Sequence, residues 1–461
     1  MKTPRLAALV LVSLIPAVAT AATWTVASVE PTLSSTESYA LRLDATGTPR
    51  VAFGRSASSV LYGVWDGQGF ELETAYPAFS GAPADPASPQ LLLTWVVDLA
   101  IGTDGEPRIL HTLLNGTGPV PSGTLQLSTR NHGVWTVESL GASRGRPSLD
   151  IDGLGREHVA FMPSLPAIEY AVRSGAGWTY ETVAEEGRDP MLRLGPDGVP
   201  YVAYVGFNPT GIRLAVRAGG GWSSTFVALE NTQQGPALGI QPDGSPVIAY
   251  LDAAGTHVKF AEFDGTAWVV TPVASGGPFA FRPGLACDFA GPHVAYRDNV
   301  AQSLVVADRL GATWSPTTVD TGGNTGLDAS MASDAFGRAW VLYGSADNPN
   351  AWYARRVPVA EAPVLSPPPG IALRLSGANP IAAGVVPAFQ VELPHGDDVT
   401  LTVRDVSGRL MGERRTLHLD AGAHPVSFGA AIRTPGLYFV HVTTAGGASA
   451  STRLVVTAAG R

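Results

Sequence analysis

The stretch GPDGVPYVAY, Gly195–Tyr204, joins an Asp-Gly turn to a short apolar run that ends in an aromatic residue. An Asp-Gly turn reaches positive φ at little cost, and the run is rich in strand-forming residues. The stretch therefore predicts a hairpin between two β-strands. The same pattern recurs at Asp44–Phe53, Gly102–His111, Asp152–Phe161, Gln241–Tyr250, Asp288–Tyr296 and Asp334–Tyr343.

These repeats have a nearly regular period. Their turn glycines, which lie 43 to 58 residues apart, are Gly47, Gly105, Gly155, Gly198, Gly244, Gly291 and Gly337. Strand-rich repeats of about this length are typical of propeller blades, because a single blade cannot bury its own faces. The sequence therefore predicts an all-β protein built on a seven-bladed β-propeller.

Each repeat is predicted to hold four strands. In the fourth repeat they are 191–194, the apolar run after the turn, Ile212–Arg217 and Gly221–Val227. The last strand begins with a Gly-Trp pair, and Phe70 takes the tryptophan's place in the first repeat. A row of such rings could stack on sugars, but one large aromatic per blade at a fixed turn more often packs between neighbouring blades. We expect packing.

The last repeat lacks its fourth strand. After residues 350–357, which match a third strand, no Gly-x-Trp strand follows. Residues 22–29, ATWTVASV, match the missing pattern at the other end of the chain. We therefore predict that this N-terminal strand completes the last blade, so that the ring closes without an open sheet edge.

Residues 1–21 have the features of a secretory signal peptide. The start MKTPR is basic, the apolar stretch Leu6–Val18 is too short to span a bilayer, and Ala19-Thr20-Ala21 forms a small-x-small cleavage site. No later apolar stretch is long enough to cross a membrane. We therefore expect no transmembrane segment in the mature chain.

The chain is mildly acidic. Its formal net charge is -9, and removing Lys2 and Arg5 with the signal peptide changes this to -11. Binding to nucleic acid requires basic stripes, so nucleic acid is not an expected partner. Cys287 is the only cysteine, which excludes an internal disulfide, and its apolar surroundings predict a buried, unreactive thiol.

A proline-rich stretch follows the repeats. Residues 358–370 read PVAEAPVLSPPPG and are predicted to form an extended linker after a propeller that spans residues 22–357. Alternating apolar residues return in 371–461, in short runs separated by turn residues. This pattern predicts a small β-sandwich.

The C-terminal region also carries an ordered set of motifs. They are Asn379-Pro380, Val391-x-Leu393-Pro394, Val399-x-Leu401-x-Val403-x-Asp405-x-x-Gly408-Arg409, Ala421-Gly422-x-His424-x-Val426, Gly436-Leu437-Tyr438-Phe439 and Arg453-Leu454-Val455-Val456. Together they resemble the type A sorting domain of the type IX secretion system, over roughly residues 371–457. The Ig-like domain of flagellar hook-capping proteins is similar.

This resemblance implies an Ig-like fold for residues 371–461 and export by the outer-membrane machinery of a bacterium. The mature chain would then be secreted or held at the outer-membrane surface. One departure from the family pattern is that the chain runs four residues past Thr457. The alternative is an Ig-like module with no sorting role. The repeats in turn loosely resemble uncharacterised secreted bacterial seven-bladed propellers with a D-x-x-G-x-P-h-h-A-Y pattern.

No motif in the chain points to catalysis, a cofactor or a metal. Asp150-Ile151-Asp152-Gly153 suggests a calcium loop, but Asp152 is the ordinary turn aspartate of the repeat, so we expect an Asx turn. His111 breaks the aromatic pattern of its run, and we interpret it as a strand residue. We therefore predict no catalytic residue, no cofactor and no metal ligand.

Two insertions interrupt the period, Ala75–Leu93 and Leu113–Thr124, and in a four-stranded blade both connections emerge on one face of the disc. Because loops on a rigid scaffold are common binding sites, we predict a non-catalytic module that binds a glycan or a protein there. The alternative is a carbohydrate-active enzyme, a glycoside hydrolase or lyase, with paired carboxylates at the channel mouth. The predicted inner strands are nearly free of acids, which disfavours it. A purely structural surface protein is the third possibility.

Overall fold

The computed structural model describes most of the chain. The described residues are 23–29, 38–55, 59–77, 94–115, 122–163, 166–232, 234–277, 279, 281–288, 290–334, 337–348, 350–357, 371–376, 381–405, 411, 414–428, 431–434, 436–444 and 449–457. The predicted signal peptide, 1–21, and linker, 358–370, lie outside them. Contacts divide the chain into two compact units, Met1–Val359 and Ala360–Arg461. Nowhere in the described ranges is there a helix long and apolar enough to cross a membrane.

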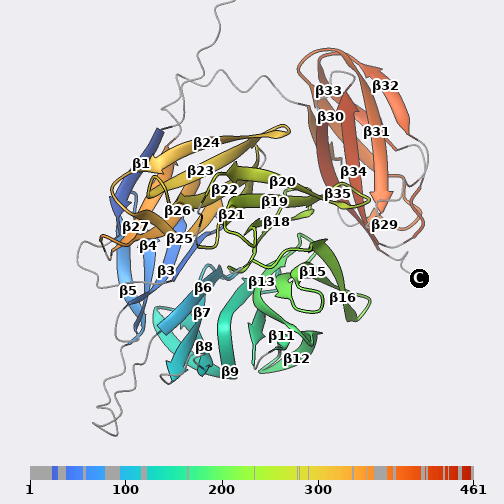
Figure 1. Cartoon of the computed structure of the whole chain (residues 1–461). Helices are drawn as coiled ribbons and strands as arrows, with labels where there is room; N and C mark the ends of the chain where they lie inside the picture. The colour runs from blue at the N-terminus through green and yellow to red at the C-terminus, as the bar shows by residue number, and fades with distance from the viewer. Residues whose placement is uncertain are drawn as a thin grey trace, which may run out of the picture. The chain divides into compact units, whose positions relative to one another are not determined.

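The first unit is a β-propeller of four-stranded antiparallel units, which we call blades (Figure 1). The first blade is β2 (Tyr39–Leu43), β3 (Pro49–Arg55), β4 (Ser59–Trp65) and β5 (Phe70–Tyr76). The next two share one seven-stranded sheet: β6 (Thr94–Ile101), β7 (Pro107–Asn115), β8 (Ser122–Asn131), β9 (Val134–Ile151), β10 (Glu157–Met162), β11 (Ile168–Ser174) and β12 (Gly177–Ala184). Each blade runs from an inner strand at the axis to an outer strand at the rim.

The following blades repeat this arrangement. The fourth is β13 (Gly187–Leu194), β14 (Pro200–Gly206), β15 (Gly211–Ala218) and β16 (Gly221–Ala228). The fifth is β17 (Ala237–Ile240), β18 (Pro246–Leu251), β19 (His257–Phe263) and β20 (Trp268–Ser275). The sixth is β21 (Gly284–Asp288), β22 (Gly291–Asp298), β23 (Ser303–Leu310) and β24 (Thr313–Asp320).

The last blade is closed by the other end of the chain. It contains β25 (Thr325–Ser333), β26 (Ala339–Ser345), β27 (Ala351–Val357) and β1 (Thr23–Ser28). β1 pairs antiparallel with β27, with Thr23 opposite Val357 and Ser28 opposite Trp352, as the blue and orange strands of Figure 1 show. The predicted pairing of the N-terminal strand with the last repeat is therefore present.

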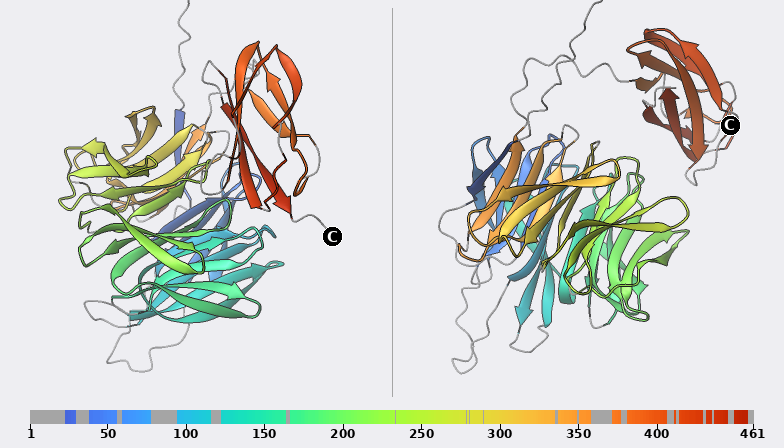
Figure 2. Two further views of the ribbon diagram at one scale, coloured as in Figure 1. Left: turned by 90° about the vertical axis from the view of Figure 1, so that its right-hand side faces the viewer. Right: turned by 45° about the horizontal axis from the view of Figure 1, so that its top comes forward.

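The inner strands form a ring. Neighbours in contact run in the order β2, β6, β9, β13, β17, β21 and β25, and β25 in turn contacts β2. The two views of Figure 2 show the same sheets packed face to face around this ring. The turn glycines of all the repeats have positive φ, from 75° at Gly337 to 126° at Gly291, as the Asp-Gly turns predict.

One predicted break is absent. The sequence predicts an outer strand at 133–140 and a separate inner strand at Ser148–Ile151, but the structure has the single 18-residue strand β9. The residues between them stay paired on both sides, because Ser143 pairs with Gly123 of β8 and Arg144 with Met162 of β10. The second and third blades are therefore joined by continuous hydrogen bonding.

The outer-strand aromatic residues pack against the preceding blade, as predicted. Trp222 of β16 lies 5.1 Å from Tyr170 of β11, between ring centroids. Phe70 of β5 lies 5.4 Å from Tyr353 of β27, which belongs to the last blade. These edge-to-face contacts place the rings in the interfaces between blades, where they stabilise the ring.

The second unit consists of two sheets around one core. One sheet contains β28 (Ala372–Leu375), β30 (Ala388–Leu393) and β33 (Gly422–Ser427). The other contains β29 (Ile381–Ala382), β35 (Ser449–Thr457), β34 (Gly436–Thr444), β31 (Asp397–Asp405) and β32 (Arg415–Leu419). Phe389 and Val391 from the first sheet and Leu401 and Val440 from the second share the core. This is the two-layer arrangement of a β-sandwich.

Candidate functional site

The insertions predicted to carry the binding site lie largely outside the described residues, which end at Pro77 and Asn115 and resume at Thr94 and Ser122. The Tyr76 ring, near the start of the first insertion, lies 4.8 Å from the ring of His111, two residues before the second insertion. The face on which the insertions emerge stays a prediction.

His111 has a structural role. Its side chain is fully buried, and its Nε2 lies 3.1 Å from the Ser128 hydroxyl. Burial lowers the pKa of His111 to about 3, so the ring is neutral at physiological pH. The interpretation of His111 as a strand residue is consistent with these contacts.

The axis of the propeller is more acidic than predicted. Inner strands β6, β9 and β25 carry Asp98, Asp150 and Asp328. The prediction that inner strands are nearly free of acids is therefore wrong for these three strands, although it holds for β17.

These axial acids are already engaged. The Asp98 carboxylate accepts hydrogen bonds from Arg42 Nη2 at 2.8 Å and from the Ser148 hydroxyl at 2.9 Å. Arg146 Nη1 lies 2.9 and 2.8 Å from the two oxygens of Asp328. Burial alone would raise the pKa of Asp98, but the charge of Arg42 and other donors lower it below its usual value. Asp98 therefore stays ionised and cannot serve as the proton donor of a hydrolase.

An open cleft lies between the second and third blades. Its volume is about 530 Å³. It is lined by Leu127, Thr129, Thr136, Val137, Glu138, Glu157, Arg173 and Gly175. We call it the interblade cleft. The strands that form it, β8 to β11, are those held together by the continuous strand β9, so its walls are rigid.

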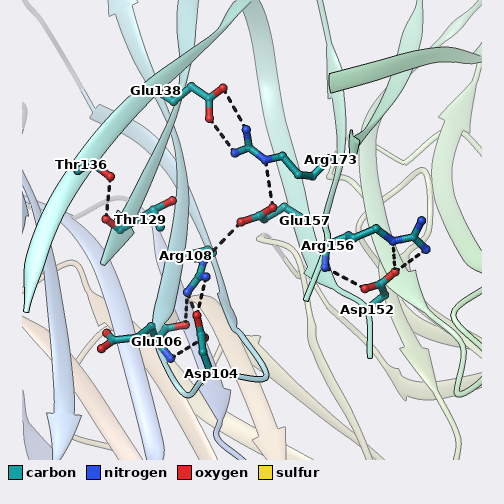
Figure 3. A network of polar contacts seen from close by, with 10 residues as sticks. All are labelled: Asp104, Glu106, Arg108, Thr129, Thr136, Glu138, Asp152, Arg156, Glu157 and Arg173. Carbon is teal, nitrogen blue, oxygen red and sulfur yellow. Dashed lines mark hydrogen bonds and ion pairs between the residues drawn. The ribbon is translucent and has the colours of Figure 1, made fainter. Parts of the chain in front are cut away.

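Arg173 stands at the centre of this cleft, between two glutamates (Figure 3). Its Nη1 and Nη2 donate to the two oxygens of Glu138 at 3.2 and 2.7 Å. Its Nε donates to Glu157 at 3.2 Å, and the other Glu157 oxygen accepts from Arg108 Nε at 3.4 Å. The guanidinium is thus fixed in a plane by both partners, as two-pronged Arg–carboxylate pairs generally are.

Glu157 is the residue that sets this cleft apart. It is buried, with 7% of its surface exposed. It stands where most repeats have a proline, as at Pro107 and Pro200. A carboxylate at this position of β10 can hold an arginine of the next strand, β11, which a proline cannot do. Glu157 was not among the residues predicted from the sequence, although its departure from the proline of the repeat is a signal that could have identified it.

Glu138 and Arg173 keep their charges in the cleft. Burial disfavours the charged form of Glu138, but hydrogen bonds from Arg173 and from the Trp178 indole, at 3.0 Å, lower the pKa of this carboxyl. Burial likewise opposes the charge of Arg173, yet the hydrogen bond to Glu138 and the charge of Glu157 raise its pKa. Glu138 therefore stays an ionised acceptor beside the fixed donors of Arg173.

Part of this arrangement faces solvent. The Glu138 side chain is 43% exposed, whereas that of Arg173 is 21% exposed. Tyr180 of the neighbouring outer strand is 46% exposed, and burial together with the charge of Glu138 raises the pKa of its phenol. A carboxylate, a guanidinium, threonine hydroxyls and an aromatic ring thus occur together. Such a set suits a polar ligand with flat apolar patches.

Two other sequence predictions concern side-chain chemistry. Asp152 Oδ1 accepts hydrogen bonds from the backbone N–H groups of Leu154 and Arg156, both at 2.9 Å, which is the predicted Asx turn. Cys287 is only half-buried rather than fully buried, but burial raises the pKa of its thiol to about 12, so it stays protonated and unreactive. Within the described ranges, no group of three or more potential ligands could hold a metal ion.

Comparison with known proteins gives similarity to solved structures only. The SapL1 lectin in complex with alpha methyl fucoside is 12% identical, with a TM-score of 0.43, over 63% of this chain and 98% of that chain. AofleA from Arthrobotrys oligospora is 10% identical, with a TM-score of 0.40, over 89% and 94%. The GH93 alpha-L-arabinofuranosidase of Fusarium graminearum is also 10% identical, with a TM-score of 0.40, over 70% and 93%. No family model and no curated protein matches the chain.

Proposed function

We propose that the propeller is a non-catalytic binding module that holds a glycan in the interblade cleft. The observation that carries this proposal is the fixed Glu138–Arg173–Glu157 arrangement inside an open cleft of about 530 Å³. Sugar hydroxyl groups both donate and accept hydrogen bonds, so neighbouring carboxylate and guanidinium groups can bind adjacent hydroxyls. The exposed Tyr180 ring offers a surface for the apolar face of a sugar ring.

The ionisation of the cleft favours binding over hydrolysis. A glycosidase needs one carboxyl with a raised pKa as proton donor, together with a second carboxylate. The pKa of Glu138 in the cleft and that of Asp98 at the axis are both lowered. A protein ligand remains the competing occupant of the cleft, and the test below separates the two.

The proposal extends to the whole chain. A propeller of seven blades is supported by the cyclic order of the inner strands, and an Ig-like fold of residues 371–461 by the two sheets that share one core. Residues 1–21 would direct secretion, and residues 371–461 would bring the protein to the outer-membrane export machinery and out to the cell surface. Deleting 371–461 should leave the propeller inside the cell envelope, which fractionation of expressing cells would show.

The test of binding uses two arginines in matched positions. Arg217 pairs with Glu181 through two hydrogen bonds of 2.7 Å, and the Trp222 indole donates to the same glutamate, as Trp178 does to Glu138. In the fourth blade, the repeat position that corresponds to Glu157 is occupied by Pro200. R217Q therefore removes the same kind of interblade pair as R173Q, away from the cleft.

The mature chain, residues 22–461, would be applied to a glycan array with both variants. We expect a glycan to bind the unmodified protein, and R173Q to weaken that binding about tenfold or more, since lost charged hydrogen bonds are worth about 1.5–3 kcal/mol. R217Q should bind normally. Equal losses in both variants, or a glycan whose binding survives R173Q, would contradict the proposal. A blank array with capture of protein ligands instead would favour a protein partner, and release of sugars from a bound polysaccharide would favour the enzyme.

A further inference from the structure

A small cavity lies on the axis of the propeller. Its volume is about 30 Å³, and every inner strand of the ring contributes to its wall. The lining residues with charged side chains are Arg42, Asp98, Arg193 and Arg282. Space of this size holds about two water molecules or one small ion, but no sugar. The axial cavity is therefore a separate site from the interblade cleft.

The single lining carboxylate is already saturated. Asp98 Oδ1 accepts from Arg42 Nη2 at 2.8 Å, while Oδ2 accepts from the Ser148 hydroxyl and the Leu149 N–H, both at 2.9 Å. Arg193 Nη1 lies 4.0 Å from Oδ2, beyond hydrogen-bond distance. Asp98 thus neutralises one of the three arginines and leaves an excess of positive charge in the wall.

Charges behind the wall reduce this excess without removing it. Arg146 and Asp328 form an ion pair across the ring, between β9 and β25. Asp189 pairs with Arg188, and Asp150 accepts from the Leu194 N–H. Counting these with the lining groups gives five arginines against four aspartates, so this set of groups carries one net positive charge.

Arg282 has no counter-charge of its own. In the part of the chain that the structure describes, no carboxylate or carbonyl accepts a hydrogen bond from its guanidinium, although a guanidinium has five N–H donors. Burial in the channel and the nearby charge of Arg146 lower the pKa of Arg282. Burial and the charge of Arg42 likewise lower that of Arg193, to about 10. Both arginines are only partly buried, but an excess of positive charge around a small cavity favours an anion there.

We propose that the axial cavity binds one small inorganic anion of chloride size, held by Arg282 with support from Arg193. The anion would supply the acceptor that the Arg282 guanidinium lacks and would balance the excess charge of the wall. Because the wall includes residues from every inner strand, a bound anion would link all the blades at the axis. Its binding should therefore stabilise the folded ring, since it binds the native state and has no site in the unfolded chain.

The direct test is diffraction. Crystals of the mature chain grown in sodium bromide should show an anomalous bromide peak within hydrogen-bond distance of the Arg282 guanidinium. The companion measurement is thermal unfolding at constant ionic strength while sodium chloride replaces sodium gluconate, whose anion is too large for the cavity. The midpoint temperature should stay nearly constant below the dissociation constant for chloride and rise with the logarithm of the chloride concentration above it. Because the ionic strength is constant, general charge screening would leave the midpoint unchanged.

Two variants separate the site from general effects. R282Q should abolish the logarithmic rise with chloride, whereas R217Q, at the rim, should keep it. Should R282Q fail to fold, R282K keeps a positive charge with fewer donors and should show a rise that begins at a higher chloride concentration. A bromide map without a peak at Arg282, or an unchanged rise with chloride in R282Q, would overturn the proposal. Glycan binding plays no part in either measurement, so this result is independent of the proposed function.

Discussion

Two histidines occupy the same position of the repeat and bind the same kind of partner. His158 Nε2 lies 3.2 Å from Asp152, and His293 Nε2 lies 2.9 Å from Asp288, each the turn aspartate of its own blade. Their second ring nitrogens differ. His158 Nδ1 meets the neutral Tyr170 hydroxyl at 2.5 Å, whereas His293 Nδ1 meets the Asp308 carboxylate at 2.5 Å. The same position of the repeat therefore favours a neutral histidine in the third blade and a charged histidine in the sixth.

The two environments shift the histidine pKa values in opposite directions. Burial lowers the pKa of His158, and one aspartate does not offset it. Burial also opposes the charge of His293, but hydrogen bonds to Asp288 and Asp308 raise its pKa above 6.5. Arg356, paired with Asp308 at 2.9 Å, is the other charged group at this site.

These shifts predict a pH dependence of stability. Because the folded-state pKa of His293 is raised, its stabilisation is complete below about pH 6.5 and is lost as the pH rises through the folded value. H293Q should therefore be most destabilised relative to the unmodified protein near pH 5–6, and the difference should shrink at higher pH. Asp288 and Asp308 have lowered pKa values, so their contribution is lost only on stronger acidification. Midpoint temperatures measured from pH 5 to 9 would show this.

H158Q provides the contrast. His158 is neutral in the folded state, so the unmodified protein loses stability as the pH falls below about 6.5, where the unfolded chain takes up the proton first. On acidification, the unmodified protein should therefore lose more stability than H158Q does. If the midpoint temperatures of H158Q and H293Q changed with pH in the same way relative to the unmodified protein, the paired carboxylates would not determine the pKa values of these histidines.

Among the strands, a recurring arginine–acid ion pair links five of the blades to the next one along the ring. An arginine late in the third strand meets a glutamate of the preceding outer strand in the pairs Arg130–Glu73, Arg173–Glu138 and Arg217–Glu181. In the later blades the acid moves to the preceding third strand, as in Arg309–Glu262 and Arg356–Asp308. Partly exposed pairs of this kind contribute little each, so they fix the orientation of the blades more than they stabilise them.

The strands that carry these ion pairs can be predicted from the sequence, but the ion pairs themselves cannot. Turn glycines, β-branched runs and the Gly-Trp starts depend on neighbouring residues, so they predict the hairpins and the closing strand. The contact of Arg173 with Glu138 joins residues from different blades, and the contact of Arg146 with Asp328 crosses the ring. Such contacts depend on how the blades are arranged in space, so neither the cleft nor the axial cluster could be predicted from the repeat.

The closing strand offers a prediction at the scale of an element. Trp24 and Val26 of β1 pack against a core that combines the sixth and last blades, including Val306 and Val341. W24A should lower the free energy of unfolding by about 2–3 kcal/mol, somewhat below the 3–5 kcal/mol typical of fully buried tryptophan, because Trp24 is partly exposed. T23A, at an exposed position of the same strand, should change it by about 0.5 kcal/mol or less.

Chemical denaturation of the two variants would measure both values. A chain that begins at Pro31 lacks the whole of β1 and should unfold at a clearly lower temperature than either variant, because β27 then has a free edge. Equal midpoint temperatures for that shortened chain and the mature chain would show that β1 does not close the ring.

Over the whole propeller, the first strand of the chain does not belong to the first blade but to the last one. Every blade but the last is built from consecutive strands, and the last takes β1 from the start of the chain. The ends of the propeller chain therefore meet side by side, with Thr23 opposite Val357. The ring is held at this point by hydrogen bonds and side-chain packing rather than by a covalent link, so it is the place where the propeller can open first.

A circular permutant tests this closure for the molecule as a whole. A short glycine-containing turn would join Val357 to Thr23, which the antiparallel pairing brings together, and new ends would be opened between Gly219 and Gly220 in the exposed turn before β16. The outer strand β16 then becomes the strand that closes its blade without a covalent link. Since every strand keeps its neighbours, the permutant should fold and unfold in one transition, with a midpoint within about 10 °C of the propeller with its natural ends, a change of a few kcal/mol. Scanning calorimetry would measure this, and a permutant that fails to fold, or that melts in two separate steps, would show that the ring depends on where the chain begins.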